Sequence, residues 1–141
     1  MRHCESLGNR ENIFQGQLDL DISATGEKQL ALLALRFRNI PIDAVYSSPL
    51  KRAYKTAEAV DLYHSLPIIK LPELMEVDVG ALSGMKLDKA FADYPVFAEK
   101  WQNSPQNCIF PEGETTAEVY DRAKKALALS LIHISEPTRR T

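Results

Sequence analysis

The chain places an arginine directly before a histidine, as Arg2-His3, among small and polar residues. A neutral imidazole offers a nucleophilic ring nitrogen, and a guanidinium offers a planar set of N–H donors that matches phosphate oxygens. The pair has the chemistry to hold a phosphoryl group and to attack its phosphorus. Such pairs also occur as ordinary surface residues, so the interpretation depends on the rest of the chain.

A second arginine, Arg52, follows a short strand predicted at residues 43–47. Ser48 is the predicted N-cap of the next helix, and Pro49 suits its first position. Ligands of open α/β sheets bind beyond the carboxyl ends of the strands, where a helix N-terminus offers free N–H groups to an anion. Arg52 is therefore placed to reach a phosphate; the alternative is a solvated arginine at an ordinary helix start.

Two carboxylic acids, Glu76 and Asp78, lie in a predicted loop at residues 73–84. Cleavage of a phosphate ester benefits from an acid that protonates the leaving oxygen, and a carboxyl group does so when burial or a nearby anion raises its pKa. The residue types do not choose between the two, and a loop carboxylate in water is the commoner case. Cys4 is interpreted as a small residue beside the site and His64 as a helix-end histidine without a catalytic role.

The elements that must position these side chains alternate between helix and strand. A helix is predicted after the N-cap Ser23, with an apolar face made of Leu30, Leu33, Ala34 and Phe37. Strands are predicted at residues 43–47 and 67–71 with a helix between them, and further helices at 86–93, at 96–102 and after the capping box Thr115–Glu118. Residues 10–22 are predicted as a loop. The alternation is typical of βαβ units and predicts an α/β fold with a parallel sheet.

The composition is that of an ordinary globular domain. The chain has 141 residues, of which 45% are hydrophobic and 26% charged, and its formal net charge is -2. This charge favours neither nucleic acid nor an anionic membrane as a partner, and no apolar run approaches the ~20 residues of a membrane span. Cys4 and Cys108 follow no disulfide or metal-ligand spacing. We therefore expect a cytoplasmic protein that binds neither a metal ion nor a membrane.

Taken in order, these motifs resemble the histidine phosphatase superfamily, the phosphoglycerate mutase-like proteins. The resemblance runs from residue 1 to about residue 128. It is carried by Arg2-His3-Cys4-Glu5-Ser6 with Asn9, Phe14-Gln15-Gly16-Gln17-Leu18-Asp19, Tyr46-Ser47-Ser48-Pro49-Leu50-Lys51-Arg52, Leu74-Met75-Glu76 with Gly80 and Gly84, and Pro111-Glu112-Gly113-Glu114 with Arg122. It implies a three-layer α/β/α fold with a mainly parallel sheet, incomplete in this chain. The chain departs from the family pattern at Cys4, where glycine is common.

The resemblance also implies a role for each site residue. His3 would be the nucleophile that becomes a phosphohistidine, and Glu76, rather than Asp78, would be the acid that protonates the leaving group. The implied phosphate-binding residues are Arg2, Asn9 and Arg52, and the implied substrate-side loop is Phe14, Gln15 and Gly16. No metal ion or organic cofactor is implied.

The implied activity is that of a phosphomonoesterase that hydrolyses a small phosphorylated metabolite through a phosphohistidine. The enzymatic alternative is a cofactor-dependent phosphoglycerate mutase, but the stretch from Glu76 to Gly113 is short beside the longer insertion typical of the mutases. The alternative of another class is a non-catalytic phosphate-binding domain.

Both ends of the sequence depart from the family pattern. Only Met1 precedes Arg2, where the family has a strand. The family's second catalytic histidine lies on a strand after the last helix, and His133 is its only candidate here. The C-terminal tail also resembles the translation of a transposon-type sequencing adapter. We therefore expect a fragment of a histidine phosphatase-like domain at residues 1–128, a non-native tail at 129–141, and an expressed chain that is unstable and inactive.

Overall fold

Helices and strands alternate along the chain in this computed structural model, which describes the backbone of residues 1–135 and the side chains of residues 1–132. The helices are α1 (Leu7–Glu11), α2 (Ala24–Phe37), α3 (Lys51–Asp61), α4 (Leu87–Asp93), α5 (Pro95–Asn103) and α6 (Thr116–Ser135). The strands are β1 (Val45–Ser47) and β2 (Ile68–Lys70), and the short 3-10 turns are η1 (Pro72–Leu74), η2 (Gly80–Leu82) and η3 (Pro105–Asn107). Each helix and strand predicted from the sequence is present, with shorter strands than expected.

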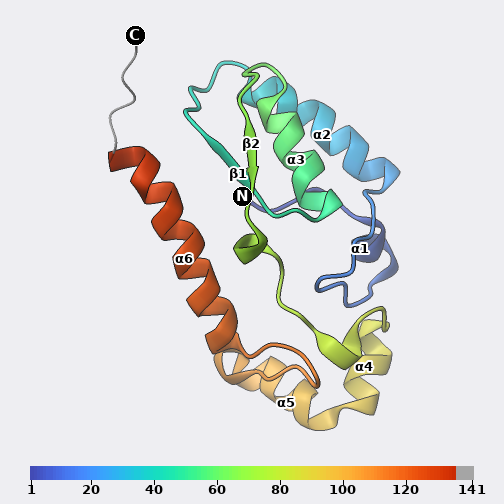
Figure 1. Ribbon diagram of the computed structural model, residues 1–141. Coiled ribbons are helices and arrows are strands. Elements are labelled where there is room, and N and C mark those ends of the chain that lie inside the picture. Colours follow the sequence, from blue (N-terminus) through green and yellow to red (C-terminus); the bar gives the residue numbers. More distant parts are fainter. Residues whose placement is uncertain (136–141) are drawn as a thin grey trace.

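The two strands β1 and β2 pair in parallel, with Val45 opposite Ile68 and Ser47 opposite Lys70. α3 connects them, as a parallel pair requires a crossover. α2 and α3 lie on one side of the strand pair and α6 lies on the other (Figure 1). The predicted α/β fold with a parallel sheet is therefore confirmed. Because parallel strands end at the same edge, the segments that follow β1 and β2 leave the sheet side by side.

The starts of α2 and α3 are fixed in different ways. The Ser23 hydroxyl accepts a hydrogen bond from the Gly26 N–H at 3.0 Å, which confirms it as an N-cap. The prediction of Ser48 as the N-cap of α3 is wrong, because this helix begins at Lys51. The Lys51 N–H instead donates to the Asp19 carboxylate at 2.7 Å. The Asp19 carboxylate, which comes from a distant loop, thus accepts from a free N–H at the start of α3, as a local N-cap side chain does in other helices.

α1 is missed by the sequence prediction, which has a loop over residues 10–22. The buried Ser6 hydroxyl accepts from the Asn9 N–H at 3.2 Å, and the Asn9 side-chain oxygen accepts from the Ser6 N–H at 3.0 Å. This is a capping box in which asparagine replaces the usual glutamate or glutamine. The short helix gives the chain a fixed turn soon after His3.

A cluster of buried apolar side chains involves α4 and α5. Phe14 lies in it, with edge-on ring contacts to Phe91 and Phe97 at centroid distances of 6.0 and 5.9 Å. Val79 belongs to the same cluster and is 2% exposed. The loop that carries Glu76 is therefore anchored in the core three residues further along the chain.

Two glycines let this loop cross closely over the segment that precedes α6. A Cβ at Gly80 would lie 2.2 Å from the Pro111 carbonyl oxygen, and a Cβ at Gly113 would lie 2.2 Å from the Asp78 carbonyl oxygen. Gly80 also has a φ of 51°, in the left-handed region. The two backbones therefore touch directly, and a side chain at either glycine would separate them.

α6 begins where it was expected to and continues beyond the expected domain end. The Thr115 hydroxyl accepts from the Glu118 N–H at 3.2 Å, which is one half of the predicted capping box. The helix passes Ala128 and reaches Ser135. Residues 136–141 of the predicted tail lie outside the described part of the chain.

The apolar side chains of α6 are only partly covered. Ala126 is 2% exposed, whereas Leu127 is 60% exposed and Leu131 is 51% exposed. In the described residues, this helix therefore presents apolar side chains to solvent. None of the described helices combines the length and the apolar character that a membrane crossing requires.

Candidate active site

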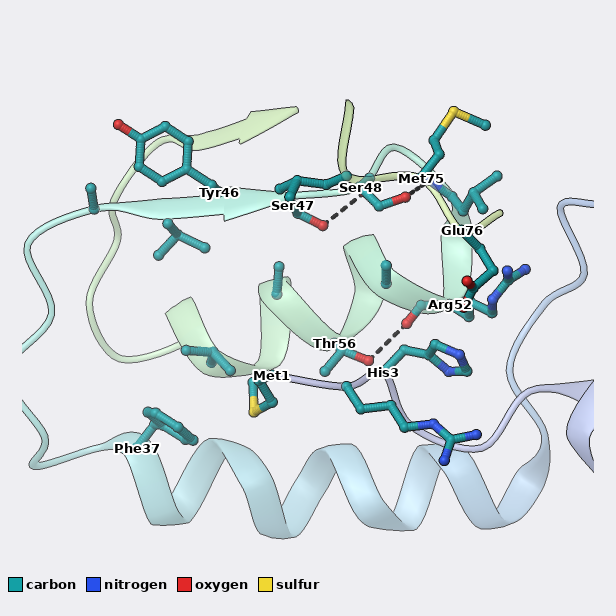
Figure 2. A pocket seen from close by; sticks show the side chains of 18 of the residues that line it. Met1, His3, Phe37, Tyr46, Ser47, Ser48, Arg52, Thr56, Met75 and Glu76 are labelled. Atoms are coloured by element: carbon teal, nitrogen blue, oxygen red, sulfur yellow. Dashed lines mark hydrogen bonds between the residues drawn. The ribbon is translucent and has the colours of Figure 1, made fainter. Parts of the chain in front are cut away.

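A cavity of about 560 Å³ lies between the N-terminal segment, β1, α3 and the loop after η1. The side chains of Arg2, His3, Arg52 and Glu76 all line it. Figure 2 shows His3, Arg52 and Glu76 at the same end of the cavity. Residues from separate parts of the sequence thus combine into one charged site.

The opposite end of the cavity is more apolar. Met1, Phe37 and Tyr46 lie there (Figure 2). Binding sites for small molecules commonly combine a few polar groups with an apolar wall. The cavity therefore offers room beyond its charged end for the organic part of a ligand.

His3 lies on a segment to which no strand is assigned. The N–H of the next residue, Cys4, donates to the Thr56 hydroxyl at 3.0 Å. That hydroxyl in turn donates to the Arg52 carbonyl at 2.7 Å. One hydrogen bond to α3 therefore helps to position the backbone after His3, where strand pairing was expected from the family pattern.

Cys4 is accommodated beside the site without entering the cavity lining. Its side chain is buried, and a Cβ at Gly26 would lie 3.3 Å from its Sγ. The absence of a side chain at Gly26 thus makes room for the thiol at the start of α2. Cys4 and Cys108 are both free and buried.

The surroundings of His3 lower its pKa below the ordinary 6.5. Burial is the main cause and the charges of Arg52 and Arg2 add to it, whereas the Cys4 carbonyl and the Glu76 carboxylate act in the opposite direction. The Nδ1 atom lies within hydrogen-bond distance of the Cys4 carbonyl. Because a carbonyl only accepts, we assign the proton of neutral His3 to Nδ1, which leaves the lone pair on Nε2.

We expect the folded chain to lose stability as the pH falls from about 6.5, the ordinary pKa of an imidazole. Below that pH the unfolded chain binds a proton at His3 that the folded chain still excludes, so the free energy of unfolding decreases until the lower folded-state pKa is passed. NMR titration gives the pKa of His3, and urea unfolding over the same pH range gives the free energy. In His3→Asn this part of the pH dependence should vanish, and an unchanged slope would contradict the expectation.

Arg52 is buried, with 2% of its surface exposed. Its Nη1 donates to the Leu18 carbonyl at 2.8 Å, and its Nη2 donates to the Gly16 carbonyl at 2.6 Å. Each terminal nitrogen has a second N–H, and the side chain lines the cavity. Arg52 therefore joins a distant loop to α3 and also gives the cavity a buried positive charge.

The structure separates the two carboxylates that the residue types leave open. Glu76 lines the cavity. Asp78 is turned onto its own loop, where its carboxylate accepts from the Gly80 N–H at 2.9 Å. Of the two, Glu76 is the carboxylate that faces a ligand beside His3.

Four residues predicted to face the phosphate or the substrate lie outside the cavity lining. Asn9 caps α1 through Ser6, and Gln15 accepts from the Ser6 hydroxyl at 2.7 Å. Phe14 belongs to the apolar core, and the Gly16 carbonyl binds a buried arginine. These side chains and this carbonyl already have partners within the fold, so they stabilise the segments around the cavity and do not face a ligand.

Two residues to which sequence reasoning gives no role, Glu114 and Arg122, bind the loop that carries Glu76. Arg122 donates to the carbonyls of Met75 and Glu76 and forms an ion pair with Glu114 at 2.8 Å. Their positions on either side of a helix start are a weak local signal. The carbonyl contacts depend on the tertiary structure and leave no trace in the spacing.

Of the other two histidines, His64 does not line the cavity, and the side chain of His133 lies outside the described residues. The His64 ring is 2.7 Å from the Phe37 carbonyl, which fits its interpretation as a helix-end histidine. His133 falls within α6 rather than on a strand, and its side chain lies outside the described residues. In the part of the chain that is described, no group of His, Cys, Asp and Glu side chains has an arrangement suited to a metal ion.

Comparison with known proteins agrees with this geometry. Phosphoserine phosphatase 1 of Hydrogenobacter thermophilus is 40% identical over 124 residues, which cover 88% of this chain and 59% of that protein. "Probable phosphoglycerate mutase GpmB" of Erwinia tasmaniensis is 32% identical over 139 residues, or 97% of this chain and 65% of that protein. The solved structure of Bacillus stearothermophilus YhfR superposes with a TM-score of 0.87 at 27% identity and covers 96% of this chain and 66% of that one.

These relatives are longer than the chain, which spans 59% and 65% of the two curated proteins. The family model described as "Histidine phosphatase superfamily (branch 1)" matches residues 1–136. Family match, fold and cavity agree, and the chain belongs to the histidine phosphatase superfamily.

Proposed function

We propose that the protein to which this chain contributes is a phosphomonoesterase that works through a phosphohistidine at His3. The observation that carries the proposal is the joint presence of His3, Arg2, Arg52 and Glu76 at one cavity. A nucleophile, two phosphate-binding cations and a proton donor are the groups that hydrolysis of a phosphate ester needs. The family membership supports the same reading.

In the first half of the reaction, Nε2 of neutral His3 attacks the phosphorus of the ester. The bond between phosphorus and the leaving oxygen breaks, and Glu76 in its neutral form gives its proton to that oxygen. Arg2 and Arg52 stabilise the charge on the remaining phosphoryl oxygens as the bond to nitrogen forms.

In the second half, water attacks the phosphohistidine. The Glu76 carboxylate takes a proton from that water, the bond between phosphorus and nitrogen breaks, and inorganic phosphate leaves. His3 returns to its neutral form and Glu76 to its protonated form. The two halves together consume one ester and one water and release one alcohol and one phosphate, so no cofactor is required.

The proposed substrate is a small phosphorylated metabolite in the cytoplasm. The cavity of about 560 Å³ matches a small ligand, and the name of the Hydrogenobacter thermophilus relative points to a phosphorylated amino acid. The name of the Erwinia tasmaniensis relative favours the mutase alternative. Phosphate release from phosphoserine and isomerisation of phosphoglycerate, assayed side by side, distinguish the two activities.

The non-catalytic alternative rests on one observation. Among the described side chains, His3 is the only histidine that lines the cavity. A phosphate-binding domain of this kind would bind orthovanadate without forming a phosphoenzyme. Trapping a phosphate on His3 that is labile in acid and stable in alkali supports the enzyme, whereas vanadate binding without such an adduct supports the binding domain.

Glu76→Gln should slow turnover by about 10²-fold or more, because glutamine can neither give a proton to the leaving oxygen nor take one from water. The loss should be smaller for an ester whose leaving group is acidic, such as p-nitrophenyl phosphate, since such a group departs without protonation. Steady-state kinetics on both kinds of ester measure the difference. Asp78→Asn serves as the control, and equal losses for both esters would contradict the role of Glu76.

A further inference from the structure

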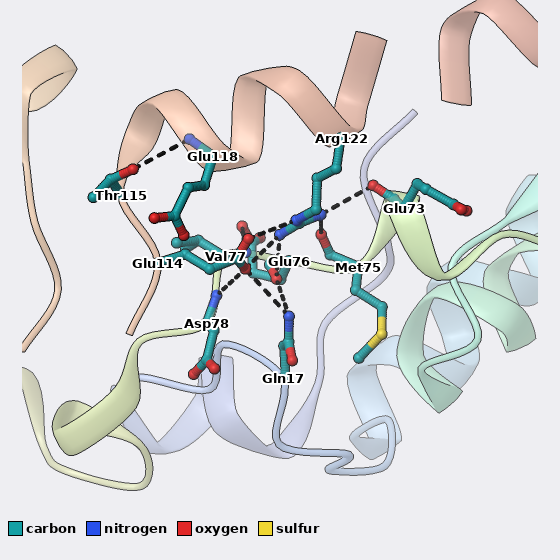
Figure 3. Close-up of polar contacts among 10 residues, drawn as sticks. All are labelled: Gln17, Glu73, Met75, Glu76, Val77, Asp78, Glu114, Thr115, Glu118 and Arg122. Atoms are coloured by element: carbon teal, nitrogen blue, oxygen red, sulfur yellow. Dashed lines mark hydrogen bonds and ion pairs between the residues drawn. The ribbon is translucent and has the colours of Figure 1, made fainter. Parts of the chain in front are cut away.

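Arg122 binds the loop around Glu76 with both terminal nitrogens of its guanidinium group, and its Nε donates to the Glu114 carboxylate (Figure 3). Its Nη1 donates to the carbonyls of Glu73, at 2.9 Å, and Met75, and its Nη2 donates to the Glu76 carbonyl at 2.9 Å. The Glu73 carbonyl belongs to η1, and the other two belong to the loop that follows it. One side chain from α6 therefore fixes the backbone at and before Glu76.

Glu114 holds both Arg122 and the other side of the same loop. Its carboxylate accepts from Arg122 Nε at 2.8 Å and from Nη2 at 2.9 Å. It also accepts from the Asp78 N–H at 2.9 Å and from the Gln17 side chain at 3.3 Å. Gln17 reaches the Glu76 carbonyl as well, at 3.3 Å. The loop is thus held before, at and after Glu76.

The chemistry of the pair suits this task. A guanidinium can serve several carbonyls and a carboxylate at once, because its donors are fixed in one plane. Both side chains are 19% exposed, so solvent competes only weakly for their hydrogen bonds. The hydrogen bonds from Arg122 lower the pKa of Glu114, which keeps its carboxylate ionised.

The Glu76 side chain is itself held loosely. The residue is exposed, and its carboxylate accepts from the N–H of its neighbour Val77 at 3.0 Å. Because the Glu76 side chain has few contacts of its own, the backbone at Glu76 determines its position. The direction of Glu76 toward His3 therefore depends on the contacts of the loop backbone.

We infer that Arg122 and Glu114 form a clamp that positions Glu76 for proton transfer at the charged end of the cavity. Neither residue lines the cavity, so both are positioning residues. The inference rests on the proposed function for its effect on turnover. The effect of the clamp on geometry, which is the distance between the Glu76 charge and His3, does not depend on the proposed function.

The test uses Arg122→Gln and Glu114→Gln, with Glu76→Gln as the reference. The titration is made on the 141-residue chain, and turnover is measured on the longer protein to which this chain contributes. Lys124→Gln and Glu118→Gln are matched controls, because both residues are exposed on the same helix. NMR titration of His3 is the first measurement, since the Glu76 charge raises the pKa of His3 against burial and the charges of Arg52 and Arg2. Urea unfolding of each variant separates a moved loop from an unfolded chain.

We expect both clamp variants to lower the pKa of His3 in the same direction as Glu76→Gln, while the controls leave it at the wild-type value. Orthovanadate affinity should stay within about twofold of wild type, because the phosphate-binding arginines are untouched. With an ester substrate, kcat should fall by about 10²-fold with little change in KM, the scale on which a small misplacement of a reacting group acts. Arg122→Lys should recover only part of kcat, because an ammonium lacks the planar set of donors.

A folded Arg122→Gln with the wild-type His3 titration would overturn the inference. If that variant does not fold, the isosteric Glu114→Gln decides by the same criterion. Absence of ester hydrolysis and of a phosphoenzyme in the longer wild-type protein would refute the proposed function alone, because the titration still reports on the clamp. Loss of kcat in the clamp variants with an unchanged titration would refute the positioning of Glu76 and leave the enzymatic function standing.

Discussion

His3→Asn should abolish the phosphoenzyme and reduce ester hydrolysis by at least about 10³-fold, the scale on which loss of a covalent nucleophile acts. Asparagine is close to imidazole in size and keeps a donor for the Cys4 carbonyl, but its amide nitrogen has no nucleophilic lone pair. Binding of orthovanadate should persist, because Arg2 and Arg52 remain in the cavity lining. Phosphorus NMR of the trapped intermediate and steady-state rates measure the two effects.

His64→Asn is the matched control, because His64 lies near the end of α3 and binds the Phe37 carbonyl. This variant should keep the phosphoenzyme and the turnover of wild type. A phosphoenzyme that survives His3→Asn and disappears in His64→Asn would reverse the assignment of the nucleophile.

Arg52→Met should destabilise the fold by about 3–5 kcal/mol and weaken orthovanadate binding by about tenfold or more. The first effect arises because the carbonyls of Gly16 and Leu18 lose charge-assisted donors, each of which contributes about 1.5–3 kcal/mol. The second arises because the cavity loses a buried cation, and 1.4 kcal/mol corresponds to a tenfold change in affinity. Urea unfolding and vanadate titration measure them separately.

Lys51→Met provides the control on the neighbouring position. The Lys51 side chain is exposed, and its backbone N–H, which binds Asp19, is unaffected by the substitution. Stability and affinity should therefore remain close to wild type. Arg52→Met with the stability of wild type would show that the two carbonyls find other donors, and would remove Arg52 from the support of the loop.

The sequence predicts well those elements that its local pattern determines. The face of α2 follows from apolar spacing, the parallel pair of β1 and β2 follows from alternation with helices, and Ser23 acts as the N-cap it resembles. α1 and the start of α3 were predicted wrongly. In both cases the deciding group is a side chain whose partner does not follow from simple spacing rules: asparagine in a capping box, and the Asp19 carboxylate thirty-two residues before Lys51.

The candidate site shows the same division. Arg2, His3, Arg52 and Glu76 all line the cavity, as the motifs of the sequence predict. Arg52 lies at the helix start that follows β1, and Glu76 lies in the loop that follows β2 and η1. Asn9 and the segment Phe14–Gly16 carry residue types that fit the family, yet the Asn9 and Phe14 side chains belong to the cap of α1 and to the aromatic core. The Gly16 backbone carbonyl binds the buried arginine. Residue type gives a position its chemistry, and long-range contacts decide which way the side chain faces.

Arg122 and Glu114, the residues of the clamp, are synthesised after the charged residues of the cavity. Synthesis proceeds from the N-terminus, so His3, Arg52 and Glu76 leave the ribosome before the clamp does. The hydrogen bond from Gln17 to Glu114 closes a loop of 97 residues, and contacts of such sequence separation form slowly. The nascent chain therefore carries every charged group of the cavity for some time without the geometry that joins them. We expect the charged end of the cavity to take its final geometry only when the first turns of α6 have emerged and folded back onto the loop.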